Sequence, residues 1–307
     1  MVGGPGGPRP ADARLTGAGR PTGAARLSSE TGAAYAAAAD GWDAGPGQLY
    51  RDLALALVRQ AGPVAGLRVL DLGAGTGVAG LAALTAGAAR VVAADLAPAM
   101  LARSPAGLLP VAADAAHLPF LARSFDLTLA AFCLGHLPDV PVCLAEIRRV
   151  SAALAVSSFA PGWTHPAKRA VDDALAAFGY RPPGWYATFK QETEPRSQDP
   201  AWLRGRLTAA GFTDVAVRTV SVRTGLATPA QLVAWRLGMA HVAPFVAALD
   251  AGRRAALRRA AEAAVADAAG NRVADAAGNR VADAAGNRVA DAAGNPLTVS
   301  MVLLTAG

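Results

Sequence analysis

The stretch Val69-Leu70-Asp71-Leu72-Gly73-Ala74-Gly75-Thr76-Gly77 decides the fold, because it places three alternating glycines directly after a short apolar run. Glycine lets the backbone turn sharply and approach a ligand without a clash from a Cβ atom. Residues 78–86 then carry a helical pattern, and a helix N-terminus offers free N–H groups and a partial positive charge. The stretch therefore predicts a strand, a ligand-binding turn and a helix in succession.

Short apolar runs and helical patterns continue to alternate along the chain, and helical signal begins near Ser29. Expected strands lie at 67–70, 90–94, 109–111, 125–131, 152–158, 214–222 and 297–304, and expected helices at 48–60, 78–86, 98–102, 140–150, 201–210, 229–239 and 251–264. Such alternation builds a parallel sheet with helices on both faces. We predict an α/β fold for residues 28–307, with a Rossmann-like, seven-stranded, mostly parallel sheet in a single domain.

Three segments depart from this alternation. Residues 1–27 are rich in Gly, Pro, Ala and Arg and predict a disordered tail. Residues 161–200 carry two tryptophans and two tyrosines among prolines, which favours a helical, aromatic insert that caps a substrate. Residues 265–296 hold four copies of an eight-residue unit, Val-Ala-Asp-Ala-Ala-Gly-Asn-Arg, the last ending in Pro296. A unit without a large apolar side chain cannot stack into a core, so we interpret the repeat as a flexible loop expanded by replication slippage.

Composition argues against several kinds of partner. The net charge of +6 comes almost wholly from arginines, but these are dispersed without a basic run between aromatic residues, which disfavours nucleic acid. Cys133 and Cys143 have no metal-binding spacing, so we expect no metal and a reducing, cytoplasmic setting. The uncharged stretch 72–89 is too crowded with glycine for a membrane span. A homodimer is left open.

The residues around the turn leave two kinds of cofactor open. Gly75-Thr76-Gly77-Val78-Ala79-Gly80 fits the dinucleotide pattern G-x-G-x-x-G. Counted from Gly73, however, the third pattern position is Val78. Asp71 would also sit poorly beside a pyrophosphate, whereas it suits an amino-acid ammonium group. Asp95 ends the next strand, where a carboxylate can hold ribose hydroxyls in either case.

Downstream motifs favour one of these cofactors. Asp114-Ala115-Ala116-His117-Leu118-Pro119-Phe120, followed by Ser124-Phe125-Asp126, resembles the class I methyltransferases that use S-adenosylmethionine (SAM), especially the branch acting on small molecules and on quinones in ubiquinone and menaquinone biosynthesis. Four further stretches match in order: Tyr35-x-x-x-Ala39-x-x-Trp42-Asp43, 95–101, 134–139 and 144–150. The chain departs from the family where a Pro-Gly-Gly turn usually precedes the fifth strand, since Val150-Ser151-Ala152-Ala153-Leu154 stands there instead.

The resemblance implies SAM as the cofactor, S-adenosylhomocysteine (SAH) as its product, and a set of contacts. Tyr35 would close over SAM, Asp95 would hold the ribose, Asp114 would accept from the adenine amino group, and the N–H of Ala115 would meet the ring. The cofactor-binding residues expected in this way are Tyr35, Asp71, Gly73, Ala74, Gly75, Gly77, Asp95, Leu96, Met100, Asp114, Ala115 and Phe132.

Two histidines are candidates for catalysis. His136 follows the fourth expected strand, close to where the methyl group should lie, and is either a general base or a structural residue. His165 lies in the aromatic insert, where it either contacts substrate or packs. Asp139 is expected to cap a helix. Cys133 follows Phe132 rather than a proline, which indicates a small buried residue rather than a nucleophile.

These observations predict a methyltransferase that moves the sulfonium methyl group to O, C or N of a small molecule, such as a secondary metabolite or a quinone-like acceptor. One alternative is a SAM-binding member of the same fold that transfers no methyl group and acts as a cyclase or scaffold. The other is an NAD-dependent oxidoreductase resting on Gly75, Gly77 and Gly80.

Overall fold

The computed structural model describes residues 23–270 and 296–307. The strands are β1 (Arg68–Leu72), β2 (Arg90–Asp95), β3 (Leu108–Ala112), β4 (Phe125–Ala131), β5 (Ser151–Phe159), β6 (Ala216–Arg223) and β7 (Thr298–Ala306). The helices are α1 (Gly23–Trp42), α2 (Pro46–Ala61), α3 (Val78–Thr85), α4 (Pro98–Leu101), α5 (Val140–Val150), α6 (Pro166–Ala177), α7 (Gly184–Thr188), α8 (Glu194–Gln198), α9 (Pro200–Ala209), α10 (Pro229–Leu237), α11 (Ala243–Ala248) and α12 (Ala251–Gly270), with a 3₁₀ turn η1 (Leu134–His136) and a π-helical turn η2 (Phe189–Thr193).

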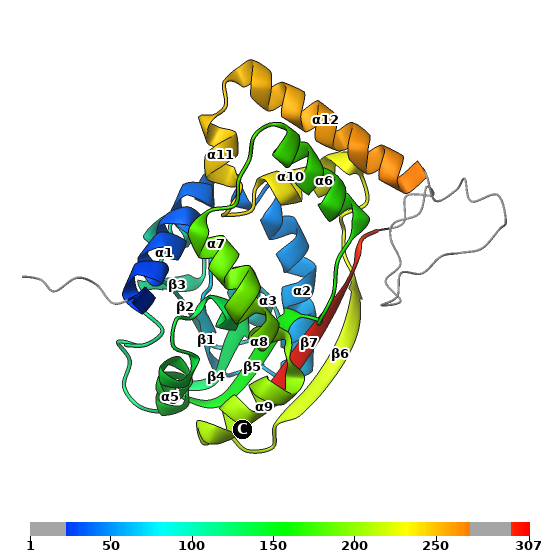
Figure 1. The fold of residues 1–307 in the computed structure, drawn as a ribbon. Coiled ribbons are helices and arrows are strands. Elements are labelled where there is room, and N and C mark those ends of the chain that lie inside the picture. The colour runs from blue at the N-terminus through cyan, green and yellow to red at the C-terminus, as the bar shows by residue number, and fades with distance from the viewer. Residues whose placement is uncertain (1–22, 271–295) are drawn as a thin grey trace, which may run out of the picture.

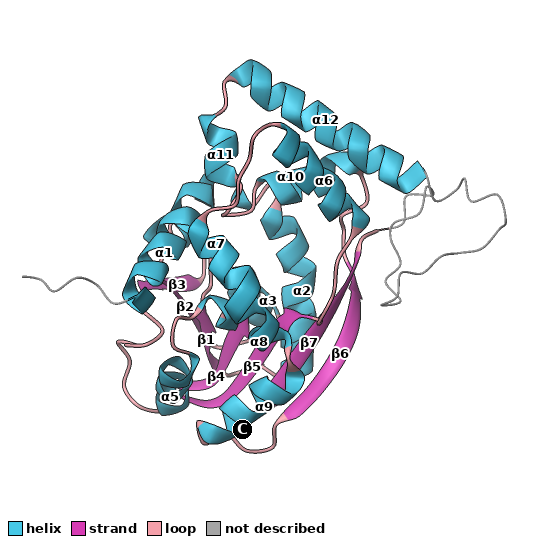
Figure 2. Ribbon diagram, in the orientation of Figure 1, coloured by secondary structure: helices cyan, strands magenta, loops and turns pink. Residues whose placement is uncertain are grey.

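The strands form one sheet in the order β3-β2-β1-β4-β5-β7-β6. The pairs from β3 to β5 are parallel, and β7 runs antiparallel to both β5 and β6. Figure 2 shows this twisted sheet with helices on both sides. The predicted seven-stranded, mostly parallel α/β fold is confirmed.

Successive residues of the inner strands face opposite layers. Val69 and Leu129 belong to one apolar cluster, which they share with α2 and α3. Leu70 and Leu72 belong to the other, which they share with α5 and α9. Because side chains alternate across a strand, a run that is apolar at every position can bury both faces of a sheet. This explains why the expected strands appear in the sequence as continuous apolar runs.

Helix α5 passes directly into β5. The helix ends at Val150 and the strand begins at Ser151, whose Cα lies beside that of Phe125 at the start of β4. The buried hydroxyl groups of Ser151 and Thr128 are 2.5 Å apart. The missing Pro-Gly-Gly turn therefore leaves the register of β5 against β4 intact.

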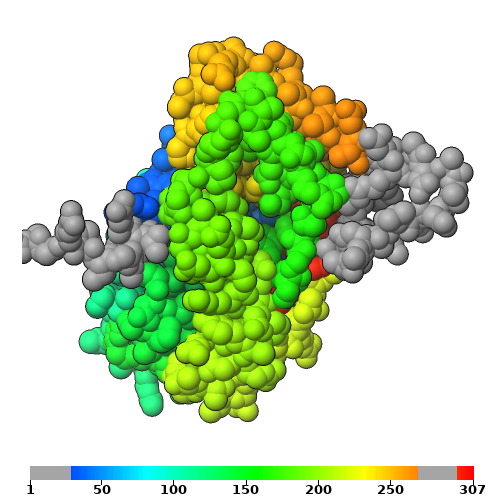
Figure 3. All heavy atoms as spheres, in the orientation of Figure 1, coloured from blue at the N-terminus to red at the C-terminus, as the bar shows by residue number. Residues whose placement is uncertain are grey.

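The aromatic segment 161–200 forms α6, α7, η2 and α8. Helix α12 packs along α6 and α10 and adds a second layer above them (Figure 1). In the space-filling view, the segments α6 to α9 cover the middle of the face shown (Figure 3). The cap is thus larger than the predicted insert, because helices from beyond residue 200 support it.

Two expected boundaries were wrong. Helix α1 begins at Gly23, so the helix includes residues 23–27 of the predicted tail. Helix α12 continues to Gly270, and Val265 in the first repeat copy is buried. Alanine is the best helix former, and both stretches continue an alanine-rich helix. The remainder of the predicted tail and of the repeat lies outside the described residues. Within those residues, no helix is long and apolar enough to cross a membrane.

Candidate functional site

The glycine turn after β1 adopts the conformation that its sequence predicts. Gly73, Gly75 and Gly77 all have positive φ angles, of 66°, 56° and 87°. A Cβ atom on Gly73 would lie 2.5 Å from Cβ of Cys133, and one on Gly77 would lie 2.6 Å from Leu108. Only glycine combines this backbone conformation with such close packing. The turn therefore brings bare backbone against one wall of a cavity of about 160 Å³.

Asp71 is the penultimate residue of β1, beneath this turn, and is 1% exposed. Its Oδ2 accepts a hydrogen bond of 2.6 Å from the Gly80 N–H, which ties the strand to α3. Its Oδ1 is buried with no hydrogen-bond partner among the described residues. Burial raises the pKa of this carboxyl to about 7. An unpaired buried carboxylate oxygen is costly, and a cationic group in the cavity would satisfy it.

Asp95 ends β2 on the next side of the same cavity. One carboxylate oxygen accepts from the N–H of Gly75 and the other from the N–H of Ala97, both at 2.8 Å. Burial raises the pKa of Asp95, and these hydrogen bonds oppose the rise. Each oxygen keeps a further lone pair, so this fixed carboxylate can accept from two hydroxyl groups of a ligand.

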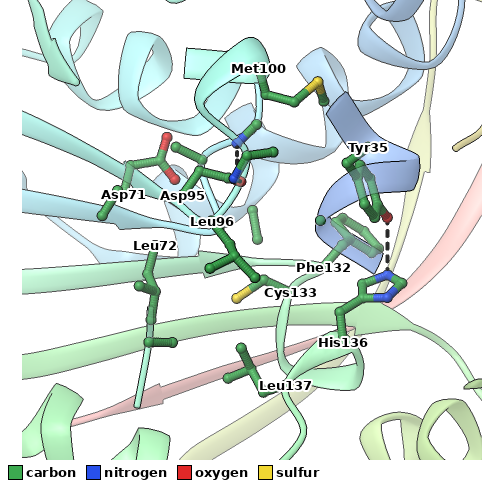
Figure 4. A pocket seen from close by; sticks show the side chains of 18 of the residues that line it. Tyr35, Asp71, Leu72, Asp95, Leu96, Met100, Phe132, Cys133, His136 and Leu137 are labelled. Carbon is green, nitrogen blue, oxygen red and sulfur yellow. Dashed lines mark hydrogen bonds between the residues drawn. The ribbon is translucent and has the colours of Figure 1, made fainter. Parts of the chain in front are cut away.

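The far rim of the cavity comes from the segments after β2 and β3. Leu96 is 46% exposed, whereas Met100 is buried beside the turn. Asp114 stabilises the loop after β3, since its Oδ1 accepts a hydrogen bond from the Ala116 N–H at 2.9 Å. Ala115 lies between these groups and also lines the cavity. Figure 4 shows how Asp71, Asp95, Leu96 and Met100 surround this space.

A second cavity, of about 300 Å³, adjoins the first beneath the cap. It lies among β5, α6, the segment α7–η2–α8 and α10. Many of the side chains that line it are aromatic, among them Trp163, Trp185, Tyr186, Phe189 and Trp235. Cavities that combine aromatic walls with placed polar groups are typical of small-molecule sites.

Four side chains line both cavities: Tyr35, Tyr50, Phe132 and His136. Tyr35 from α1 meets His136 from η1 across the boundary, with 3.2 Å between the Tyr35 hydroxyl oxygen and Nε2 of His136 (Figure 4). Phe132 lies at the end of β4 with a positive φ of 55°, a rare conformation for an aromatic residue. Burial lowers the pKa of His136 to about 4, so its ring is neutral at pH 7. The shared wall is where a group could pass from one ligand to another.

Comparison with known proteins assigns the family. A family model described as a methyltransferase domain matches residues 70–153. A demethylmenaquinone methyltransferase of Thermobifida fusca is 31% identical over 172 residues, which cover 50% of this chain and 72% of the relative. The chain belongs to the class I SAM-dependent methyltransferases.

A second relative and one solved structure are also similar to this chain. A malonyl-[acyl-carrier protein] O-methyltransferase of Halorhodospira halophila is 32% identical over 197 residues, which cover 60% of this chain. The chain spans only 62% of that relative's length. A solved structure from Anabaena variabilis, described as a methyltransferase of an antibiotic biosynthesis pathway, has a TM-score of 0.55 at 13% identity. The match covers 83% of this chain and 96% of the other, and it shows the same fold.

The family's cofactor, SAM, fits the first cavity on two observations. The unpartnered Oδ1 of Asp71 suits its ammonium group, and the fixed carboxylate of Asp95 keeps lone pairs that suit its ribose hydroxyl groups. Because the chain belongs to a SAM-dependent family, the alternative of a nicotinamide cofactor is set aside. The glycine that completed the dinucleotide pattern, Gly80, packs against Asp71 and Val91 rather than at the cavity. All of the expected cofactor-binding residues except Gly77 line this cavity, and Gly77 closes the turn behind it.

The structure does not bring His165 to either cavity. The imidazole Nδ1 accepts from the Ala167 N–H at 3.2 Å and caps the start of α6. His165 directly precedes Pro166, the first residue of α6, and a side chain at this position can cap the helix. Asp139 caps α5 as predicted, since its Oδ1 accepts from the Val142 N–H. Cys133 is a buried free thiol whose pKa is raised by burial, which agrees with a packing role.

Several lining residues were missed from sequence. Tyr50 and Trp42 stack with parallel rings 5.8 Å apart at the junction of α1 and α2. Arg236 and His241 reach the second cavity from α10 and the loop after it. Their local sequence carries no ligand-binding pattern, and only the packing of α10 under the cap brings them to the site. Tyr50 lies on α2, separated from Trp42 of α1 by a turn, so its place at the cavity also depends on how the two helices pack.

Proposed function

We propose that this protein transfers the sulfonium methyl group of SAM to a ring-bearing small molecule held in the second cavity. The observation that carries the proposal is the wall of Tyr35, Tyr50, Phe132 and His136, which lines both cavities at once. SAM, when bound, supplies a methyl group that is already activated toward a nucleophile. The protein's task is then alignment of the acceptor in a dry pocket.

The residues of the first cavity would hold the cofactor by its polar parts. Asp71 would accept from the ammonium group, Asp95 from the ribose hydroxyls and Asp114 from the adenine amino group. Tyr35 lies on α1, which packs against α4 beside Met100, so it would cover the cofactor on the side facing the acceptor.

His136 would act on the acceptor. When Nε2–H donates to the Tyr35 hydroxyl, the neutral ring keeps its lone pair on Nδ1, which can accept a hydrogen bond from a hydroxyl group of the acceptor. The low pKa makes the ring a weak base. We therefore propose that His136 orients the acceptor and receives its proton only as the new bond to carbon forms. Phe189 stacks on His136 with ring centroids 4.4 Å apart and holds the imidazole in place.

The aromatic lining of the second cavity favours a flat, ring-bearing acceptor. The Thermobifida relative is named for a quinone acceptor, which has such a ring. The Halorhodospira relative is named for a malonyl group on a carrier protein. Rings stack well on Trp163, Tyr186 and Phe189, so a ring-bearing acceptor fits this cavity better than a malonyl group. The cytoplasmic location and the absence of a nucleic-acid partner remain proposals that rest on composition.

Methyl-labelled SAM tests the proposal. Purified protein would be incubated with labelled SAM and a panel of phenols, naphthols, hydroquinones and aromatic acids, and products would be separated by chromatography. We expect label in at least one aromatic product, with SAH formed in equal amount. Binding of SAM without label in any acceptor would favour the cyclase or scaffold alternative. A protein that binds no SAM would contradict the proposal as a whole.

A further inference from the structure

A cluster of positive charge lies at one end of the second cavity. Lys168 from α6, Lys190 from η2 and Arg236 from α10 all line it. Asp172 binds both Arg236, at 2.6 Å, and Lys168, at 3.1 Å, while Lys190 pairs with Glu194. Three cations thus share two carboxylates, which leaves one positive charge uncompensated within the cluster.

Arg236 is the most deeply placed of these cations. Its side chain is 4% exposed, and one amino group of the guanidinium donates to Oδ1 of Asp172. Its Nε is buried without a hydrogen-bond partner among the residues that the structure describes. Buried donors in proteins are almost always paired, and an unpaired charged donor is costly. A ligand acceptor atom would complete the hydrogen bonding of this guanidinium.

The pKa values of His241 and Lys168 are consistent with this excess of positive charge. Burial lowers the pKa of His241 to about 2, and the charges of Arg236, Lys168 and Lys190 lower it further. Burial also lowers the pKa of Lys168, and the positive charge of Arg236 lowers it further. The three cations therefore converge on the part of the cavity occupied by His241.

A row of stacked rings joins this cationic end to the methyl-transfer end. His136 stacks on Phe189 at 4.4 Å, Phe189 on Tyr186 at 5.8 Å, and Tyr186 on His241 at 3.6 Å between ring centroids. The cationic cluster is thus separated from His136 by two intervening rings. A ligand with an anionic group at one end and a methyl-accepting group at the other would lie along this row.

We propose that the acceptor is an aromatic carboxylate, with its carboxylate bound by Arg236 Nε and Lys168, its ring along Tyr186 and Phe189, and its methylated atom beside His136. The proposal rests on the proposed function and specifies the substrate class of the same site. A neutral quinone would leave Nε unpaired, and an amine would meet three like charges. A carboxylate satisfies the donor and neutralises the excess charge.

Binding of three matched probes to the SAH-saturated full-length protein tests this proposal: 2-naphthoate, 2-naphthamide and 2-naphthylmethylammonium. They share one ring system and differ in charge. Calorimetry at fixed ionic strength should show 2-naphthoate binding about tenfold more tightly than the amide, as expected for a charge-assisted hydrogen bond, and the ammonium most weakly. Equal affinities, preference for the ammonium, or no measurable binding of the carboxylate would overturn the proposal.

Two variants locate the binding. Arg236→Gln should abolish the preference for carboxylate over amide, and Lys168→Gln should reduce it. Lys168 is partly exposed, so the second variant keeps the test valid if removal of Arg236 prevents folding. Arg258→Gln on the exposed side of α12 is the control and should change nothing. A preference that survives in Lys168→Gln and in a folded Arg236→Gln would contradict the assignment.

SAH binding separates this test from the proposed function. A protein that binds SAH but shows no preference for the carboxylate contradicts only the carboxylate subsite. A protein that binds no SAH contradicts the methyltransferase function itself.

Discussion

At the scale of single residues, the first cavity is distinguished by two carboxyl groups, one buried and one partly buried, at the ends of neighbouring strands. Asp71 is the clearest case, because it is buried at the end of a central strand with one oxygen bound to Gly80 N–H and the other unpartnered among the described residues. Such a group costs folding free energy when it is ionised. A function that needs a negative charge at this point explains why a carboxylate stands here rather than an apolar residue.

The pKa of Asp71 gives a testable pH dependence. Burial raises it from 3.8 to about 7, so between about pH 4 and 7 the native state holds a proton that the unfolded chain releases. Stability contributed by this group is therefore full below pH 4 and falls as the pH rises to 7. Asp71→Asn keeps an acceptor for Gly80 and removes the titration. Its unfolding free energy relative to the unmodified protein should rise between pH 5 and 8, by about 2–3 kcal/mol.

Urea unfolding of both proteins without cofactor, at several pH values, measures this difference. The exposed Asp173→Asn serves as the control and should follow the unmodified protein at every pH. A constant difference between Asp71→Asn and the unmodified protein from pH 5 to 8 would show that Asp71 titrates normally.

At the scale of elements, the turn after β1 is shaped by what packs behind it. Gly73 lies against Cys133 at the end of β4, where an added Cβ would come within 2.5 Å of the cysteine Cβ. The turn and the segment carrying Phe132 and His136 therefore fit together as one unit. A change in the turn should disturb the wall between the two cavities as well as the cofactor.

Gly73→Ala tests this fit, with Gly179→Ala as a matched control. Both glycines have positive φ, 66° and 92°, but an added Cβ at Gly179 would meet nothing within 4 Å. Gly179→Ala should cost about 1 kcal/mol from backbone strain alone. Gly73→Ala should cost a further 1–3 kcal/mol or so through overpacking and should lose SAH affinity. Equal losses of unfolding free energy in the two variants would contradict the close packing.

The elements were largely predictable from sequence, whereas the lining of the second cavity was not. The strands could be predicted because they are apolar runs that bury both faces of the sheet. The glycine turn and Asp95 could be predicted from their spacing, because local chain geometry fixes their positions at the ends of strands. His165 shows the limit, because a histidine before Pro166 caps a helix and only the structure shows which way its ring faces. Arg236 and His241 reach the site through long-range packing, which no local pattern encodes.

At the scale of the whole molecule, two layers with different tasks meet at one wall. Helices α1 to α4 and the ends of β1, β2 and β4 line the first cavity, while α6, α7, η2, α8 and α10 line the second. The cap connects back to the sheet through β7, which lies between β5 and β6. The connection from α12 to β7 includes residues 271–295, which lie outside the described parts of the chain.

Deletion of residues 271–294 tests whether the repeat matters. The deletion joins Gly270 to Asn295 and leaves one complete copy of the eight-residue unit. Because the free energy of closing a loop changes slowly with its length, unfolding free energy should change by less than about 1 kcal/mol. SAH affinity should stay the same. A large loss of soluble protein, or of SAH binding by the soluble fraction, would show that the repeat has a structural role.

The central claim is that SAM binds at the carboxyl ends of β1 and β2 with Asp95 as a principal contact. Calorimetric titration of SAH into the unmodified protein, Asp95→Ala and the exposed control Asp173→Ala tests it most directly. We predict binding of one SAH per chain, unchanged in Asp173→Ala and weakened by about tenfold or more in Asp95→Ala, since charge-assisted hydrogen bonds are lost. Absence of SAH binding by the unmodified protein, or equal affinity in a folded Asp95→Ala, would contradict the claim.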